Sequence, residues 1–135
     1  AALKTIPSLN TSKVTNMDYM FSGCSSLMTI PLLDRSKVTT MSNMFRACSS
    51  LTTIPSLDTS SATNMGYMFD GCTALTSVTF QCVDVRPYGN QMFRNSPIAS
   101  GNGRIYVPDN LVQAYKTASG WSTHASVIYG HSDKP

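Results

Sequence analysis

The chain has 135 residues, 41% of them hydrophobic, which suits one domain with a buried core. Charged residues make up only 13%, below the roughly 25% typical of soluble domains, and the formal net charge is +3. The basic residues are scattered and are not interleaved with aromatic ones, so we expect no nucleic-acid binding. No stretch reaches the roughly 18 consecutive apolar residues of a membrane span.

The chain repeats itself with a period of 24 residues. Thr-Ile-Pro occurs first at residues 5–7 and returns twice at that interval, and Met20, Phe21, Cys24 and Leu27 return in the same phase. A unit this short cannot bury its apolar side chains alone, so we expect the copies to stack and share one core. The predicted units are 5–28, 29–52, 53–76 and a degenerate 77–100, after a partial unit at 1–4.

Within a unit, the apolar spacing changes from that of a strand to that of a helix. Residues 27–30 place Leu and Ile three apart, which is too short for a helix and favours a brief strand. We expect that strand to end at Pro31, and its counterparts in the other units to end at Pro7 and Pro55, because proline cannot donate to a sheet ladder. A turn is predicted near Asp34, and the apolar residues of 17–24 follow the i, i+3, i+4, i+7 spacing of a short helical turn.

Residues 101–135 depart from the repeat and are predicted to close the stack as an α/β cap. Residues 105–107 favour a closing strand, and 109–116 favour an amphipathic helix with an acidic start. Trp121 is a large apolar side chain suited to plugging the open end of the core, and a last short helix is expected to reach Ile128. The predicted domains are therefore a repeat array over 1–100 and a capping module over 101–135.

The units 27–48 and 51–72 share the pattern Leu-x-Thr-Ile-Pro-x-Leu-Asp-x-Ser-x-x-Thr-x-Met-x-x-Met-Phe-x-x-Cys. This pattern resembles the BspA-type leucine-rich repeats of bacterial surface proteins, and residues 105–121 are similar to the module that often closes such arrays. The resemblance implies an α/β repeat solenoid, that is, a leucine-rich-repeat-like right-handed stack with a short parallel sheet and short helical turns. It implies a secreted or cell-surface bacterial protein that binds other proteins or surfaces, and it brings no catalytic residues.

The candidate binding residues are Thr5, Thr29, Thr53 and Ser77, which hold one phase of the repeat. Each is next to a position expected to be buried, so they should point outward from the strands as a flat polar ladder. We predict a non-enzymatic, surface-displayed module for adhesion or host interaction, whose partner is a protein or a glycan on another cell surface. The alternative is a structural spacer that holds another domain away from the cell.

Cys24, Cys48 and Cys72 form a column in which neighbours are expected roughly 5 Å apart, within disulfide range. Three members leave one unpaired, so buried free thiols are the preferred interpretation. The Met-x-x-Met pairs that precede them suggest a copper(I) ladder, but their spacing favours packing in the core. No Cys-x-x-Cys pair supports zinc, and we expect no cofactor or metal.

Two further expectations concern acidic residues and the chain start. Asp34 and Asp58 share a phase with Asn10, which suits side chains that begin a turn better than paired catalytic carboxylates. Because the chain begins inside a unit, we expect a fragment of a longer protein, with localisation signals upstream and an extracellular or cell-surface location. An uncapped first unit would expose strand edges and allow self-association there.

Overall fold

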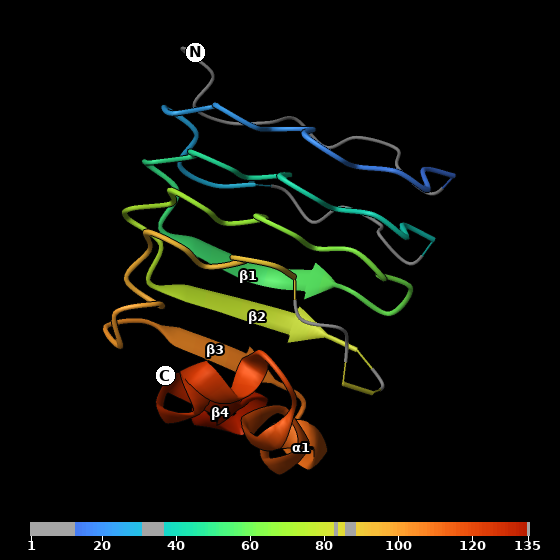
Figure 1. The fold of residues 1–135 in the computed structure, drawn as a ribbon, viewed down its shortest axis with the longest axis vertical. Helices are drawn as coiled ribbons and strands as arrows, with labels where there is room; N and C mark the ends of the chain where they lie inside the picture. Colours follow the sequence, from blue (N-terminus) through green and yellow to red (C-terminus); the bar gives the residue numbers. More distant parts are fainter. Residues whose placement is uncertain (1–12, 31–36, 83, 86–88, 135) are drawn as a thin grey trace.

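The computed structural model of the protein describes residues 13–30, 37–82, 84–85 and 89–134. Within these residues, four strands form one parallel sheet in the order β1-β2-β3-β4 (Figure 1). The strands are β1 (Thr53–Asp58), β2 (Ser77–Gln81), β3 (Arg104–Val107) and β4 (Ile128–Gly130). The parallel sheet and a few short helices agree with the predicted α/β class.

The helices of the described residues all follow β3. They are η1 (Asp109–Leu111), α1 (Val112–Thr117), η2 (Trp121–Val127) and η3 (His131–Asp133). The predicted strand at 105–107 and the predicted helix at 109–116 are confirmed. The last predicted helix is wrong at its end, because Ile128 begins β4 and pairs with Ile105. None of the helices in the described part of the chain is long and apolar enough to cross a membrane.

The strands bury one face and leave the other polar, as alternation requires. In β2, Val78 and Phe80 are buried in the core, while Ser77 lies on the opposite face. The expectation that strands end at the proline is wrong for Pro55, which lies inside β1. The register shifts between Ile54 and Leu57, so proline sits at an irregularity where no regular ladder donor is needed. Asp34, Pro7 and Pro31 lie outside the described residues.

The segment predicted as a short helical turn is a run of hydrogen-bonded turns instead. We call residues 17–24, 41–48, 65–72 and 89–96 the turn segments. Alternate backbone N–H groups in them donate to the next unit, as from Tyr19 to the Ser42 carbonyl (3.0 Å) and from Phe21 to the Met44 carbonyl (2.9 Å). These bonds between units use the N–H groups that an α-helix would need internally.

Left-handed backbone recurs at two phases of the turn segments. Tyr19, Asn43, Tyr67 and Gln91 have φ from 53° to 60°, and Ala47 and Asn95 have φ of 61° and 59°. Gly23 and Gly71 occupy the second phase, with φ of 78° and 80°. Each such residue is the third of a four-residue turn, the position where positive φ is required in a type II turn. An α-helix cannot continue through them, which is the local reason for the turns.

The core is a column of aromatic rings that crosses the units. Phe21, Phe45, Phe69 and Phe93 stack with centroid separations of 5.5 to 5.7 Å. The column meets Trp121, which is fully buried and edge-on to Phe93 and Phe80. Trp121 therefore plugs the end of the core, as its sequence position predicts.

The methionines and cysteines of the repeat line the same core, with one exception. Met44 and Met68 are fully buried, but Met20 is 38% exposed, so the prediction that it belongs to the core is wrong. Cys48 and Cys72 are free, buried thiols whose sulfurs donate to the carbonyls of Phe21 and Phe45, 27 residues earlier. Cys24 is free and half-buried.

Candidate binding face

Two of the predicted binding residues, Thr53 and Ser77, lie on the polar face of the sheet. Thr29 and Thr53 are exposed and Ser77 is half-buried, while Thr5 lies outside the described residues. In the sheet register, Thr53 is paired with Ser77, and Ser77 is paired with Arg104. The threonine and serine ladder therefore runs into the C-terminal segment and ends on a guanidinium group.

Hydroxyl groups at other phases are used to hold the units together. The Thr39, Thr63 and Thr76 hydroxyls each donate to a carbonyl 24 residues earlier, at 3.1 to 3.3 Å. The hydroxyls of Thr53 and Ser77, in contrast, make no hydrogen bond to another described residue. These two hydroxyls are available to a ligand.

Two cations and two tyrosines lie beside Ser77 on the same face. The Arg104 guanidinium is 4.8 Å from the centroid of the Tyr129 ring, and the Lys134 ammonium is 5.8 Å from that of Tyr106. The two rings are 6.2 Å apart. Cation–π contacts of this kind hold a charged group over an aromatic face. We call Ser77, Arg104, Tyr106, Tyr129 and Lys134 the strand-face patch.

A cavity of about 530 Å³ opens at the patch. It is lined by Thr76, Ser77, Asn102, Arg104, Tyr106, Asp133 and Lys134. Asp133 accepts a hydrogen bond from the Gly130 N–H (3.1 Å), and its charge offsets one of the two cations. The cavity thus combines a net positive charge with hydroxyl and amide groups, which suits recognition of a polar ligand with an acidic group.

The position of Lys134 depends on a contact between η1 and η3. The Asp109 carboxylate accepts hydrogen bonds from the backbone N–H and the hydroxyl of Ser132, at 3.0 and 3.1 Å. These bonds hold the pKa of Asp109 below its usual value, because they favour the charged form. Interaction with the Tyr106 hydroxyl raises the pKa of Arg104. Both charges are therefore present near neutral pH.

A family model described as "Mycoplasma protein of unknown function, DUF285" matches residues 1–102. The chain belongs to this DUF285 family. The match includes Thr53 and Ser77 but ends two residues before β3, so Arg104, Tyr106, Tyr129 and Lys134 lie beyond it. A comparison with curated proteins found no match.

Arg104 was not among the predicted binding residues, because the 24-residue period places a different residue next to Ser77. Twenty-four residues after Ser77 stands Gly101, whereas the sheet pairs Ser77 with Arg104, 27 residues later. The loop between the fourth turn segment and β3 supplies the three extra residues. The Gly101-Asn102-Gly103 run marks that loop, but its effect on register is visible only in the paired strands.

The other candidate groups lie elsewhere. Burial raises the pKa of Cys48 and Cys72 to about 12, which suits packing and not nucleophilic chemistry. Cys82 is half-buried, with its sulfur 3.1 Å from the Tyr115 hydroxyl. The Asp58 carboxylate accepts a bond from the Ser60 N–H, as expected for a turn-starting residue. Within the described residues, no group of three His, Cys, Asp or Glu side chains is placed to hold a metal ion.

Proposed function

We propose that the protein is a BspA-type leucine-rich-repeat solenoid that works as a non-enzymatic binding module on a bacterial cell surface. Its right-handed stack presents the ladder of Thr29, Thr53 and Ser77 to a protein or glycan partner. The partner belongs to a host or neighbouring cell, and the contact serves adhesion. Backbone bonds between successive turn segments and the 24-residue period both support this repeat architecture.

The observation that carries the proposal is the strand-face patch. It continues the hydroxyl ladder of the repeats, it opens a cavity, and it holds two cations on tyrosine rings. Tyrosine and arginine dominate many recognition surfaces because they combine apolar area with directional hydrogen bonds. The exposed ladder supplies contact area beside these anchors.

A binding screen tests the proposal. We would measure binding of the protein to extracellular-matrix proteins, mucins and a glycan array, and repeat it with Arg104→Gln. Loss of one charged hydrogen-bonding group should weaken binding by about 10-fold to 100-fold, since such bonds contribute about 1.5–3 kcal/mol. Ser77→Ala should weaken it less, by about twofold to tenfold.

Lys37→Gln is the matched control. Lys37 is exposed and lies outside the strand-face patch. Its replacement by Gln therefore removes one positive charge and leaves the ladder unchanged. Binding that falls equally in Lys37→Gln and Arg104→Gln would reflect net charge and contradict a specific face. Absence of binding by the folded protein to every target would favour the alternative function below.

The alternative is the structural spacer. It is favoured by the number of polar groups that connect one unit to the next, including the Thr39 and Thr63 hydroxyls and the Ser50 hydroxyl, which donates to the Ser25 carbonyl (2.7 Å). Side chains used in this way stiffen an array along its axis. A spacer would fold stably and bind none of the screened surfaces.

A further inference from the structure

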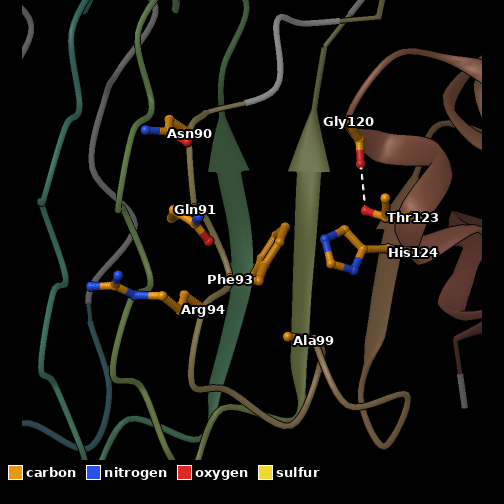
Figure 2. A pocket seen from close by; sticks show the side chains of 8 residues that line it. All are labelled: Asn90, Gln91, Phe93, Arg94, Ala99, Gly120, Thr123 and His124. Carbon is orange, nitrogen blue, oxygen red and sulfur yellow. Dashed lines mark hydrogen bonds between the residues drawn. The ribbon is translucent and has the colours of Figure 1, made fainter.

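A second cavity, of about 330 Å³, lies between the fourth turn segment and η2 and is lined in part by Arg94 (Figure 2). The Arg94 guanidinium is paired with the Asp70 carboxylate of the preceding unit (2.7 Å) and lies over the Tyr67 ring. Figure 2 shows the Arg94 side chain directed away from Thr123 and His124, which lie on the opposite wall. Arg94 is therefore not available to an acidic ligand in this cavity.

The two cations of the strand-face patch, in contrast, are held by uncharged groups. Arg104 and Lys134 are exposed, and neither forms an ion pair with a described residue. Arg104 lies over the Tyr129 ring and donates to the Tyr106 hydroxyl. Lys134 lies over the Tyr106 ring. Tyrosine is neutral near pH 7, so these contacts position the two cations and leave their charge uncompensated.

One carboxylate, that of Asp133, shares the cavity at the patch with the two cations. It accepts a hydrogen bond from the Gly130 N–H (3.1 Å). It contributes less to the raised pKa of Arg104 than Tyr106 and Tyr129 do, so it is not the group that holds the guanidinium. Two cations against one carboxylate leave an excess positive charge, and the cavity therefore favours an anionic ligand.

The remaining lining groups of this cavity both donate and accept hydrogen bonds. The Ser77 hydroxyl bonds to no other described residue, and the Thr76 hydroxyl donates to the Thr52 carbonyl (3.2 Å), so its oxygen still accepts. The Asn102 amide nitrogen donates to the Ser100 hydroxyl (3.3 Å), and its amide oxygen bonds to no described residue. Sugar hydroxyls also donate and accept, so these groups match a hydroxyl-rich ligand.

The cavity lacks the apolar anchor site that a protein partner normally fills. Of the described residues in its lining, only Tyr106 carries an aromatic ring, and Tyr106 is 4% exposed. Protein interfaces draw most of their affinity from large side chains that fill such sites. The volume of about 530 Å³ lies in the roughly 300–1,000 Å³ range of small-ligand sites. The end of a polar oligosaccharide therefore fits this cavity better than the surface of a folded protein.

We propose that the strand-face patch binds an acidic saccharide, that is, a sugar that carries a carboxylate or a sulfate group. The acidic group binds Arg104 and Lys134, because a guanidinium has five N–H donors and only one is used by Tyr106. The sugar hydroxyls bond to Ser77 and Asn102. A longer saccharide leaves the cavity along Thr53, which is paired with Ser77 in the sheet. The inference rests on the proposed function, since it names the ligand class of the same face.

The test is a titration of the isotope-labelled protein with small sugars, followed by amide NMR. The acidic probes are sialyllactose, which carries a carboxylate, and sulfated lactose. Their neutral controls are the methyl ester of sialyllactose and lactose, and sodium sulfate tests whether the anion alone is enough.

We expect saturable shifts of the Asn102 and Arg104 amide signals, whereas Gln91 and Thr123 in the second cavity should not shift. At least one acidic sugar should bind about 10-fold to 100-fold more tightly than its neutral control, as for charged hydrogen bonds. This preference should shrink as salt is added.

Variants assign the preference to the two cations. Arg104→Gln should remove most of it, and Lys134→Gln should reduce it by about twofold to fivefold, as for an exposed ion pair. Lys37→Gln removes a positive charge outside the patch and should leave the preference unchanged. All three side chains are exposed, and the same spectra report whether each variant is folded.

The outcomes separate this inference from the proposed function. Four results would overturn the inference: equal binding of acidic and neutral sugars, an unchanged preference in Arg104→Gln, binding of sodium sulfate as tight as that of sulfated lactose, and no shift at high millimolar concentration of either acidic sugar. Tighter binding of the acetylated peptide Gly-Glu-Gly than of either sugar would also overturn it, in favour of a protein partner. The proposed function survives these results if a protein target of the screen binds and is lost in Arg104→Gln.

Discussion

Asp70 is a buried carboxylate of the turn segments, paired with Arg46 and Arg94. Its side chain is 5% exposed, and its carboxylate accepts hydrogen bonds from the Arg94 Nε and Nη2 atoms, at 3.1 and 2.7 Å. Bonding to Arg94, helped by the charge of Arg46, holds the pKa of Asp70 below its ordinary value of 3.8. A lowered native pKa contributes stability above about pH 4 that is lost as the pH falls through the native pKa.

Asp70→Asn should therefore destabilise the protein at pH 7 by about 1.5–3 kcal/mol, the range for hydrogen bonds to charged groups. Urea denaturation of both proteins at pH 7 and at pH 3 measures this. The gap should be smaller at pH 3, because the carboxyl group of the unfolded chain is protonated there, so that folding at this pH must also ionise it. An equal gap at both pH values would show that the carboxylate contributes through its shape and not through its charge.

At the scale of the element, the turn segment depends on left-handed backbone at its second phase. Gly71 holds this conformation with φ of 80°, and a Cβ at this position would lie 3.4 Å from the Ala47 Cα atom. Ala47 holds the same conformation, with φ of 61°, despite its side chain. The two positions therefore form a matched pair for measuring the cost of this backbone conformation.

Gly71→Ala should cost about 1–2 kcal/mol, the usual penalty for a side chain in the left-handed region. Ala47→Gly relieves that strain while adding freedom to the unfolded chain, so its net effect should lie within about 1 kcal/mol of zero. Thermal unfolding of both variants checks the asymmetry. Equal destabilisation by the two changes would mean that contacts, and not φ, limit this position.

At the scale of the whole molecule, the shared core makes the units interdependent. Met44 is fully buried between neighbouring units, whereas Met20, at the same phase, is 38% exposed. Met44→Asp buries an unpaired charge and should unfold the array or cost more than about 4 kcal/mol. Met20→Asp is the control at the same phase and should cost much less. Circular dichroism melting distinguishes them, and a wild-type melting temperature for Met44→Asp would refute its place in the core.

The sequence alone determined the features that depend on the period and on alternation. Repetition at 24 residues placed Phe21, Phe45 and Phe69 at one phase, and the structure stacks them. The closing strand and the plug at Trp121 followed from composition in the same way. These features depend on burial, which a pattern of apolar residues reports directly.

Tertiary structure decided what depends on backbone partners outside the unit. Residues 17–24 carry helical spacing but form turns, because their N–H groups donate to the next unit. Ser77 meets Arg104 and not Gly101, because a loop of three extra residues shifts the phase before β3. The spacing of apolar residues in the sequence predicts which side chains are buried. The hydrogen bonds between units determine the backbone conformation and the strand register. That register brings the residues of the strand-face patch together.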